Sequence, residues 1–326
     1  MRHSFGITTN GFSTTCQAAP RNSRGSIPYA KLTSVNHTMI PAQKYLFVFI
    51  ICALMTQVLV AQDRARREIL RTNEKGINVS VKLSFGSIFI GKGTRDKILV
   101  ADYPRRDDDR EDLKITYDVS AGEGNLVIRS TDKAKWWSGS SGEKSKSNRR
   151  WSLELTDAVP ISLHIELGAG EGDLDITGLQ IAELRISSGA SAVRLACDEP
   201  NRIMAERISF ESGVGSFSAT DLGNTNFRTL KFEGGVGAYK LDFGGALRRS
   251  GEVDINVGLG AITVIIPEKT PTQLRCEDSW LSSVDIDDIF QKTRKGRYET
   301  PTYNTASEKL TIKIESGFGK VKVKGR

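Results

Sequence analysis

The chain has 326 residues, enough for one or two domains with a sizeable core. Hydrophobic residues make up 38% and charged residues 26%, which excludes a wholly disordered chain and a multi-span membrane protein. The net charge is +7, but residues 1–61 hold five basic residues and no acidic one, so that 46 − 5 = 41 basic residues face 39 acidic ones in the remainder. A remainder with a net charge of only +2 lacks the basic surface of a nucleic-acid-binding protein, and we expect no nucleic-acid partner.

The N-terminal part has the pattern of a leader. Residues 45–60 are apolar except for two polar positions, follow Lys44 and end at Ala61. A short basic region, an apolar stretch and a small residue at its end are typical of a secretory signal peptide. We therefore predict a leader over 1–61, with the signal peptide at 39–61, and we expect 1–38 not to be native. The expected location is the periplasm or the cell surface.

The alternative is a membrane anchor formed by residues 45–61. This run approaches the length of about 18 residues that a membrane helix needs. Arg64, Arg66 and Arg67 follow it directly and would hold such an anchor at the cytoplasmic side.

A Gly-x-Gly pair recurs along the chain, flanked on both sides by alternating apolar residues. The pairs begin at Gly122, Gly170, Gly189 (where Ser191 replaces the second glycine), Gly213, Gly235, Gly258 and Gly317. When the last six are aligned on the first glycine, four columns are apolar throughout. The column three positions before the glycine contains Leu167, Ile186, Phe210, Phe232, Ile255 and Ile314.

Period-two alternation on both sides of a glycine bend predicts a strand, a bend and a second strand with one buried face. A unit of about 22 residues cannot bury that face alone, but it can when stacked on its neighbours at about 4.8 Å per rung. The fold class is therefore all-β, a single-stranded β-solenoid of Gly-x-Gly rungs. The predicted domains are an N-terminal β unit at 62–131, a basic Ser/Gly/Trp linker at 132–150, the repeat core at 151–268, and an excursion with a final rung at 269–326.

Two charged patterns have plain structural interpretations. The residues four positions before the glycine should face solvent as a ladder of mixed sign: Glu166, Arg185, Ser209, Lys231, Asp254 and Lys313. Lys320, Lys322 and Lys324 alternate with valines near the C-terminus, which is typical of an edge strand protected against aggregation.

These residues resemble the toast-rack family of bacterial envelope proteins. The resemblance rests on 83–100 with Tyr103, on Trp151, and on the rungs at 167–178, 234–244 and 258–267. Related groups are proposed adhesins built of Gly-x-Gly rungs and the C-terminal part of LiaF-type cell-wall-stress proteins. The family supplies no catalytic residue that could be transferred to this chain.

The chain offers little for catalysis or metal binding. After the leader its only histidine is His164, on the outward register of a strand, so a zinc site rich in histidine is excluded. Gly86 and Gly91-Lys92 imitate the start of a phosphate-binding loop, but Gly93 replaces the required Ser/Thr. We expect no catalytic residue, no metal and no cofactor.

Cys197 and Cys276 follow turns that are three rungs apart, about 14 Å at the strand spacing. A disulfide needs Cα atoms within about 7 Å. We predict two buried thiols that are not bonded to each other.

A surface for recognition is predicted at the linker, where aromatic residues stand among cations and could contact glycans or an anionic membrane surface. Its residues are Trp136, Trp137, Lys144, Lys146, Arg149 and Arg150. The competing interpretation is a solvated loop without a binding role.

Together these observations predict a non-enzymatic, exported envelope scaffold or adhesin-like binding surface, whose partner is an envelope protein or glycan. The first alternative is an envelope-stress regulator acting through protein contacts. The second is a polysaccharide-active enzyme of the β-helix type, for which Asp173 and Asp175 form the one carboxylate pair directly after a glycine turn.

Overall fold

The computed structural model describes residues 64–104, 113–130, 150–276 and 282–326. They form a sheet of sixteen strands, with one short 3-10 turn, η3 (Leu222–Thr225), as the helical segment of this described part. No described residue belongs to a helix that is long and apolar enough to cross a membrane. The predicted all-β fold class is confirmed. The strands are β1 (Arg64–Leu70), β2 (Gly76–Lys92), β3 (Lys97–Pro104), β4 (Leu113–Ser120), β5 (Glu123–Ser130), β6 (Arg150–Leu155), β7 (Ile161–Asp175), β8 (Ile181–Ala196), β9 (Ala205–Thr220), β10 (Phe227–Asp242), β11 (Gly251–Ile266), β12 (Thr272–Cys276), β13 (Ser282–Ile286), β14 (Gln291–Arg294), β15 (Arg297–Glu299) and β16 (Leu310–Gly325).

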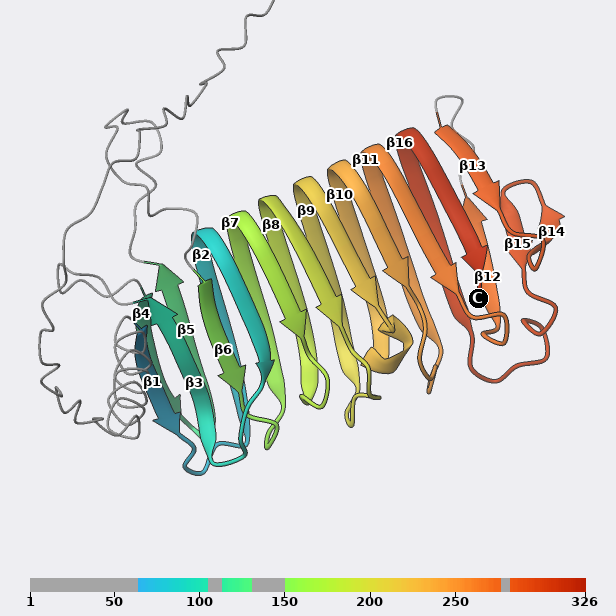
Figure 1. Ribbon diagram of the computed structural model, residues 1–326. Helices are drawn as coiled ribbons and strands as arrows, with labels where there is room; N and C mark the ends of the chain where they lie inside the picture. Colours follow the sequence, from blue (N-terminus) through green and yellow to red (C-terminus); the bar gives the residue numbers. More distant parts are fainter. Residues whose placement is uncertain (1–63, 105–112, 131–149, 277–281) are drawn as a thin grey trace, which may run out of the picture. The chain divides into compact units, whose positions relative to one another are not determined.

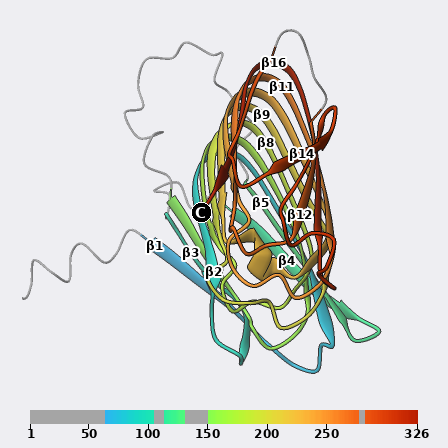
Figure 2. The ribbon, with the colours of Figure 1, turned by 90° about the vertical axis from the view of Figure 1, so that its right-hand side faces the viewer.

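Seven long strands, β2, β7 to β11 and β16, are the rungs of the stack (Figure 1). They run parallel to one another, and each bends once, which divides it into a first leg and a second leg. From β7 to β11, a loop at the open side leads from the second leg of one rung to the first leg of the next, so that the stack looks like a narrow closed coil from its end (Figure 2). One register runs through all the bends: Gly86, Gly170, Ser191, Gly215, Gly237, Gly260 and Gly319 pair in sequence.

Glycine is needed at the bend for two reasons. Gly260 has φ of 141°, which a residue with a side chain rarely adopts. A Cβ atom at this position would also overlap the carbonyl oxygen of Gly237 on the rung below. Gly319 on the next rung repeats both conditions. The paired glycines therefore mark the corner, where a side chain on the second glycine would overlap the backbone of the neighbouring rung.

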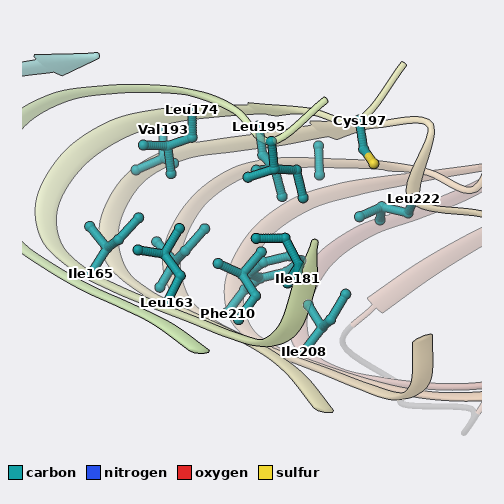
Figure 3. Close-up of a cluster of buried hydrophobic side chains, with 14 of the residues drawn as sticks. Leu163, Ile165, Leu174, Ile181, Val193, Leu195, Cys197, Ile208, Phe210 and Leu222 are labelled. Atoms are coloured by element: carbon teal, nitrogen blue, oxygen red, sulfur yellow. The ribbon is translucent and has the colours of Figure 1, made fainter. Parts of the chain in front are cut away.

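The interior is filled by apolar ladders from both legs (Figure 3). Phe210, Phe232 and Ile255 pair in register on β9, β10 and β11, and all three are 0% exposed. Across the interior, the ring of Phe217 lies 4.8 Å from that of Phe210 and 5.5 Å from that of Phe232. Such offset aromatic contacts add to the stabilisation from burial alone. The predicted internal column is confirmed.

The N-terminal end of the stack contains a rung made of two separate strands. The first leg of β2 pairs with β5 and its second leg with β6, both in parallel. Arg129 stands opposite Lys82 and Arg150 opposite Ser87, so β5 and β6 together pair with the two legs of one rung. The stretch that the sequence suggests as a linker between domains thus connects two halves of one rung. Beyond this rung, β4 covers β5, while β3 and then β1 cover β6, all antiparallel.

At the other end, the excursion after β11 supplies an outer rung. β12 pairs with the first leg of β16 and β13 with its second leg. β16 therefore lies between β11 and this outer rung, and β15 and β14 extend the first leg further. The interpretation of Lys320, Lys322 and Lys324 as an edge-strand guard is wrong, because β16 has neighbours on both sides. Lys322 instead lies 3.3 Å from Asp285 on β13.

Two positions of the predicted repeat need correction. On β7 the corner pair is Gly168 and Gly170, since Ala169 pairs with Ala190 and Gly170 with Ser191. The alignment on Gly170 as the first glycine of β7 is therefore wrong by two residues. In the outward ladder it is His164, and not Glu166, that pairs with Arg185. Gly122 belongs to a hairpin turn between the antiparallel strands β4 and β5 and not to a corner.

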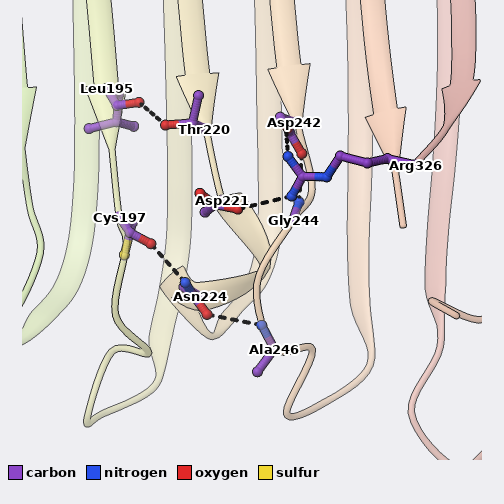
Figure 4. A network of polar contacts seen from close by, with 9 residues as sticks. All are labelled: Leu195, Cys197, Thr220, Asp221, Asn224, Asp242, Gly244, Ala246 and Arg326. Carbon is purple, nitrogen blue, oxygen red and sulfur yellow. Dashed lines mark hydrogen bonds and ion pairs between the residues drawn. The ribbon is translucent and has the colours of Figure 1, made fainter. Parts of the chain in front are cut away.

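The loops at the open side are held by side chains that reach from one rung to the next (Figure 4). The amide of Asn224 donates to the carbonyl of Cys197 at 2.9 Å and accepts the N–H of Ala246 at 2.9 Å. Cys197 and Cys276 are both buried and are not bonded to each other, as predicted. Burial is the main cause that raises the pKa of the Cys197 thiol to about 12, and Asp175 adds to it.

Candidate functional site

A row of exposed apolar side chains runs along the corner of the stack. Each stands between the two glycines of its rung, and neighbouring members pair in register from β9 to β16. The exposed fractions are 57% for Val214, 47% for Val236, 48% for Leu259 and 56% for Phe318. We call these four residues the corner ridge. A contiguous apolar row on the surface of a soluble domain is typical of a binding surface.

A groove lies beside the ridge, on the side of the first legs. Its volume is about 840 Å³, and its floor is the row of first glycines, Gly168, Gly189, Gly213 and Gly235. Because these glycines carry no side chain, the backbone is exposed between the ridge and the next outward column. We call this depression the corner groove.

The far rim of the corner groove carries carboxylates. Glu166, Glu211 and Glu233 line it, and Glu315 continues the same column on β16. Each is paired with a cation: Lys82, which stands in the same column on β2, with Glu166, Arg185 with Glu211 at 2.9 Å, Lys231 with Glu233, and Lys313 with Glu315. The hydrogen bond from Lys82 lowers the pKa of Glu166, and the hydrogen bond to Glu233 raises the pKa of Lys231. Glu166 and Lys231 therefore stay charged at neutral pH.

The ridge is bounded on its other side by the second legs. The first outward column there is small and uncharged on β8 to β11: Ala192, Ser216, Ala238 and Ala261. The next outward column contains Arg194, Lys240 and Lys322. We call the ridge, the groove and the small column together the corner strip. Its ridge and small column carry no charge on β9 to β11. One border holds carboxylates that are each paired with a cation, and in the other border Arg194, Lys240 and Lys322 alternate with Ser218 and Thr263.

The sequence matches two family descriptions that together span the stack. Residues 60–219 match the N-terminal domain of toast_rack, and residues 216–323 match the C-terminal region of LiaF, described as a cell wall-active antibiotics response protein. The chain is a toast-rack family protein. This places it with proteins of the bacterial cell envelope, as the sequence suggested. No curated protein matches the chain.

Solved structures similar to this toast-rack protein include two whole chains of distant sequence. One is a proposed cell adhesion protein from Clostridium sporogenes, with 17% identity, a TM-score of 0.42, and coverage of 81% of this chain and 99% of that chain. Another is a proposed adhesin from Bacteroides fragilis, with 13% identity, a TM-score of 0.39, and coverage of 81% and 98%.

Within the described ranges, no three His, Cys, Asp or Glu residues gather as a metal site would require. His164 lies on the outer face with its side chain 42% exposed, as predicted, 3.7 Å from Glu166. Of the carboxylate pair proposed for an enzyme, Asp175 accepts the N–H of Thr177 at 3.0 Å and so holds a turn.

The linker surface stays a prediction. Trp136, Trp137, Lys144, Lys146 and Arg149 lie outside the described residues. Arg150 is described: it opens β6, is exposed, and its carbonyl accepts a hydrogen bond from Arg64 at 3.2 Å.

The corner strip was missed at the level of sequence, although the signal was present. The residue between the paired glycines is alanine on the early rungs and becomes valine, leucine and phenylalanine on the later ones. The columns that alternate inward and outward do not include this central position. An apolar residue between two bend glycines has no interior to enter, and this indicates exposure.

Proposed function

We propose that this chain is a non-enzymatic scaffold or adhesin-like protein of the envelope, and that its corner strip docks another protein. The observation that carries the proposal is the corner ridge, four apolar side chains that are each about half exposed and are held in one line by the strand register. Burying such a row removes apolar surface from water at about 25 cal/mol per Å². The rigid rungs fix the spacing of the side chains, so little conformational entropy is lost on binding.

A protein partner suits this surface better than a glycan. Glycan recognition by apolar surfaces relies on stacking against aromatic rings, and Phe318 is the one aromatic member of the ridge. A glycan would find its aromatic partners at the predicted linker surface of Trp136 and Trp137. The two ligand classes are therefore assigned to two different parts of the chain.

The proposal includes export through the leader at 39–61. N-terminal sequencing of the protein recovered from the envelope fraction tests it. A start near residue 62 supports a cleaved signal peptide, whereas a retained apolar run that resists alkaline washing supports the anchor at 45–61.

The docking role is tested by affinity capture from envelope extracts with the full chain as bait. Val236→Asp and Leu259→Asp should each abolish capture, because a charge in the ridge must lose its hydration on binding. Val127→Asp serves as a comparison, since it places the same charge on β5, away from the ridge. Capture that is equal for all four baits contradicts the proposal.

An envelope-stress regulator is the second candidate, and the match of residues 216–323 to the LiaF C-terminal region favours it. Three of the four ridge residues fall in that segment. A strain carrying Leu259→Asp should then respond abnormally to cell wall-active antibiotics. A pure scaffold or adhesin would leave that response unchanged. The polysaccharide-active enzyme ranks last, and product formation lost in Asp173→Asn would revive it.

A further inference from the structure

We infer that the partner docked on the corner strip is a second copy of this chain, related by a two-fold axis parallel to the stack. The inference rests on the proposed function, because it names the occupant of the same surface. It follows from the shape of the strip and from the charges along its two borders.

The shape of the strip is self-complementary. The corner groove is lined by residues of β2 and β7 to β10, so it lies beside the corner ridge on β9 and β10. On β11 and β16 its floor is continued beside the ridge by the exposed first glycines Gly258 and Gly317. A two-fold axis parallel to the ridge places the ridge of each copy in the groove of the other. This arrangement buries both ridges at once, and it does so with the same patch on both copies, as a closed dimer requires.

The charges along the two borders of the strip favour a two-fold axis parallel to the stack over one that runs across the strip. Rotation about an axis parallel to the stack brings the carboxylate border of one copy beside the cationic border of the other. Each rung then faces the same rung. On β10 Glu233 approaches Lys240 of the second copy, in the second outward column, and on β16 Glu315 approaches Lys320, which occupies the first outward column there. Rotation about an axis across the strip would instead place carboxylates beside carboxylates, which is repulsive.

The dimensions predict a reversible dimer. The strip spans six rungs, β7 to β11 and β16, which at about 4.8 Å per rung give a length of about 29 Å. Its width at the convex corner is about five extended residues, or about 15 Å. The contact lies at or below the lower end of specific interfaces, where association is weak and transient. Crowding on an envelope surface would favour the dimer through its high local concentration.

Single cysteines test the axis directly. In the full chain carrying Cys16→Ser and Cys52→Ser, we would introduce Val214→Cys, Val236→Cys, Leu259→Cys or Phe318→Cys and treat each protein with a short bismaleimide. All four should give covalent dimers, because each rung faces itself, and Ser209→Cys on the outer face of the first leg should give none. The antiparallel arrangement would give dimers only at the position nearest its centre, and that result, or monomers throughout, would overturn the inference.

Charge reversal tests the borders. Glu233→Lys alone and Lys240→Glu alone should each reduce crosslinking at Phe318→Cys by about fivefold, the effect of one ion pair at each symmetric site. The double reversal should restore most of it, because the pair between the copies re-forms with its signs exchanged while Lys231 loses its partner Glu233. A double variant that is no better than the single ones rejects the proposed facing of the borders.

These outcomes separate the inference from the function on which it rests. If the purified chain stays monomeric while Val236→Asp still abolishes capture of another envelope protein, the second copy is rejected and the docking role stands. If neither self-association nor capture depends on the ridge, both are rejected.

Discussion

The guanidinium of Arg326 lies 2.9 Å from the carboxylate of Asp242, although the two residues are 84 positions apart in the chain. The Asp242 side chain is 4% exposed, and its other oxygen accepts the N–H of Gly244 at 2.9 Å. A second nitrogen of Arg326 lies 3.3 Å from Asp221 (Figure 4). The residue that follows β16 is thereby tied to the end of β10, two rungs away, and to the loop that follows β9, three rungs away.

Arg326→Ala should lower the free energy of unfolding by about 1–3 kcal/mol, because it leaves the buried carboxylate of Asp242 without its cation. Urea unfolding followed by circular dichroism measures the change. Arg228→Ala is the matched comparison: Arg228 is 70% exposed and lies 3.5 Å from Glu206, so its loss should cost no more than about 0.5 kcal/mol. Equal effects of the two substitutions would contradict the assigned role of Arg326.

Gly260→Ala should be more damaging than Gly258→Ala, although the two residues flank the same ridge side chain. At 260 the backbone has φ of 141° and a Cβ would overlap the carbonyl of Gly237. At 258 a Cβ would lie 3.0 Å from the carbonyl oxygen of Gly235, a contact that a small shift relieves. We expect a loss of at least about 2 kcal/mol for the first and less than half of that for the second, measured by urea unfolding. The reverse order would mean that the corner does not have this geometry.

Acid should weaken the N-terminal end through Glu74, which is 3% exposed. Burial alone would raise the pKa of Glu74, but hydrogen bonds, chiefly the one from Tyr117 at 2.6 Å, outweigh burial and lower that pKa. Because the pKa is lower in the folded state, the stabilisation is complete above the unfolded value of about 4.3 and is lost as the pH falls through the folded value.

The thermal midpoint of the wild type should therefore fall more steeply below about pH 5 than that of Tyr117→Phe, which lacks the donor. Other carboxylates contribute to both proteins, so the difference between the two curves isolates this hydrogen bond. Parallel curves from pH 7 to pH 3 would show that Tyr117 does not stabilise the ionised form of Glu74.

The thiol of Cys197 should be inert in the folded protein. It is 2% exposed and its pKa is raised to about 12, so the reactive thiolate is scarce at pH 8. In the background of Cys16→Ser and Cys52→Ser, alkylation of Cys197 followed by mass spectrometry should require unfolding in urea. Rapid alkylation of the native protein would show that the loop after β8 is open.

The pairing of the buried residues on neighbouring rungs was predictable from the sequence. The alternation of apolar residues and their distance from the first corner glycine give the same alignment. Phe210, Phe232 and Ile255 each stand three residues before the first corner glycine, and they form one buried column. On β7 the sequence Gly-Ala-Gly-Glu-Gly offers two overlapping pairs that share Gly170, and regular spacing alone did not choose between them. The correct choice, starting at Gly168, changes the spacing to the next rung from 19 to 21 residues. The face of each β7 side chain was still right, because an error of two residues preserves the period of two.

Spatial order was less accessible than register. β2 is a full rung, but it carries Gly86 without a second glycine of its own, so the repeat did not reveal it. The sequence also gives no sign that β16 inserts between β11 and the outer rung. The alternation of apolar and polar residues shows which face of a strand is buried, but it does not show which strand lies next to it. The lysines of β16 were accordingly interpreted as an edge. The corner ridge is exposed because its residues stand at the bend of each rung, between the two glycines.

The position of β16 beside β11 is the point on which the continuity of both the core and the corner strip depends. It is tested most directly by paired cysteines on the outer face in the background of Cys16→Ser and Cys52→Ser. Asp254 and Lys313 are register partners on these strands, so Asp254→Cys with Lys313→Cys should form an intramolecular disulfide on mild oxidation. Asp254→Cys with Arg275→Cys should form none, because β12 lies one rung further out, about 10 Å from β11. A disulfide in the second pair and none in the first would place the strands in chain order and contradict the account.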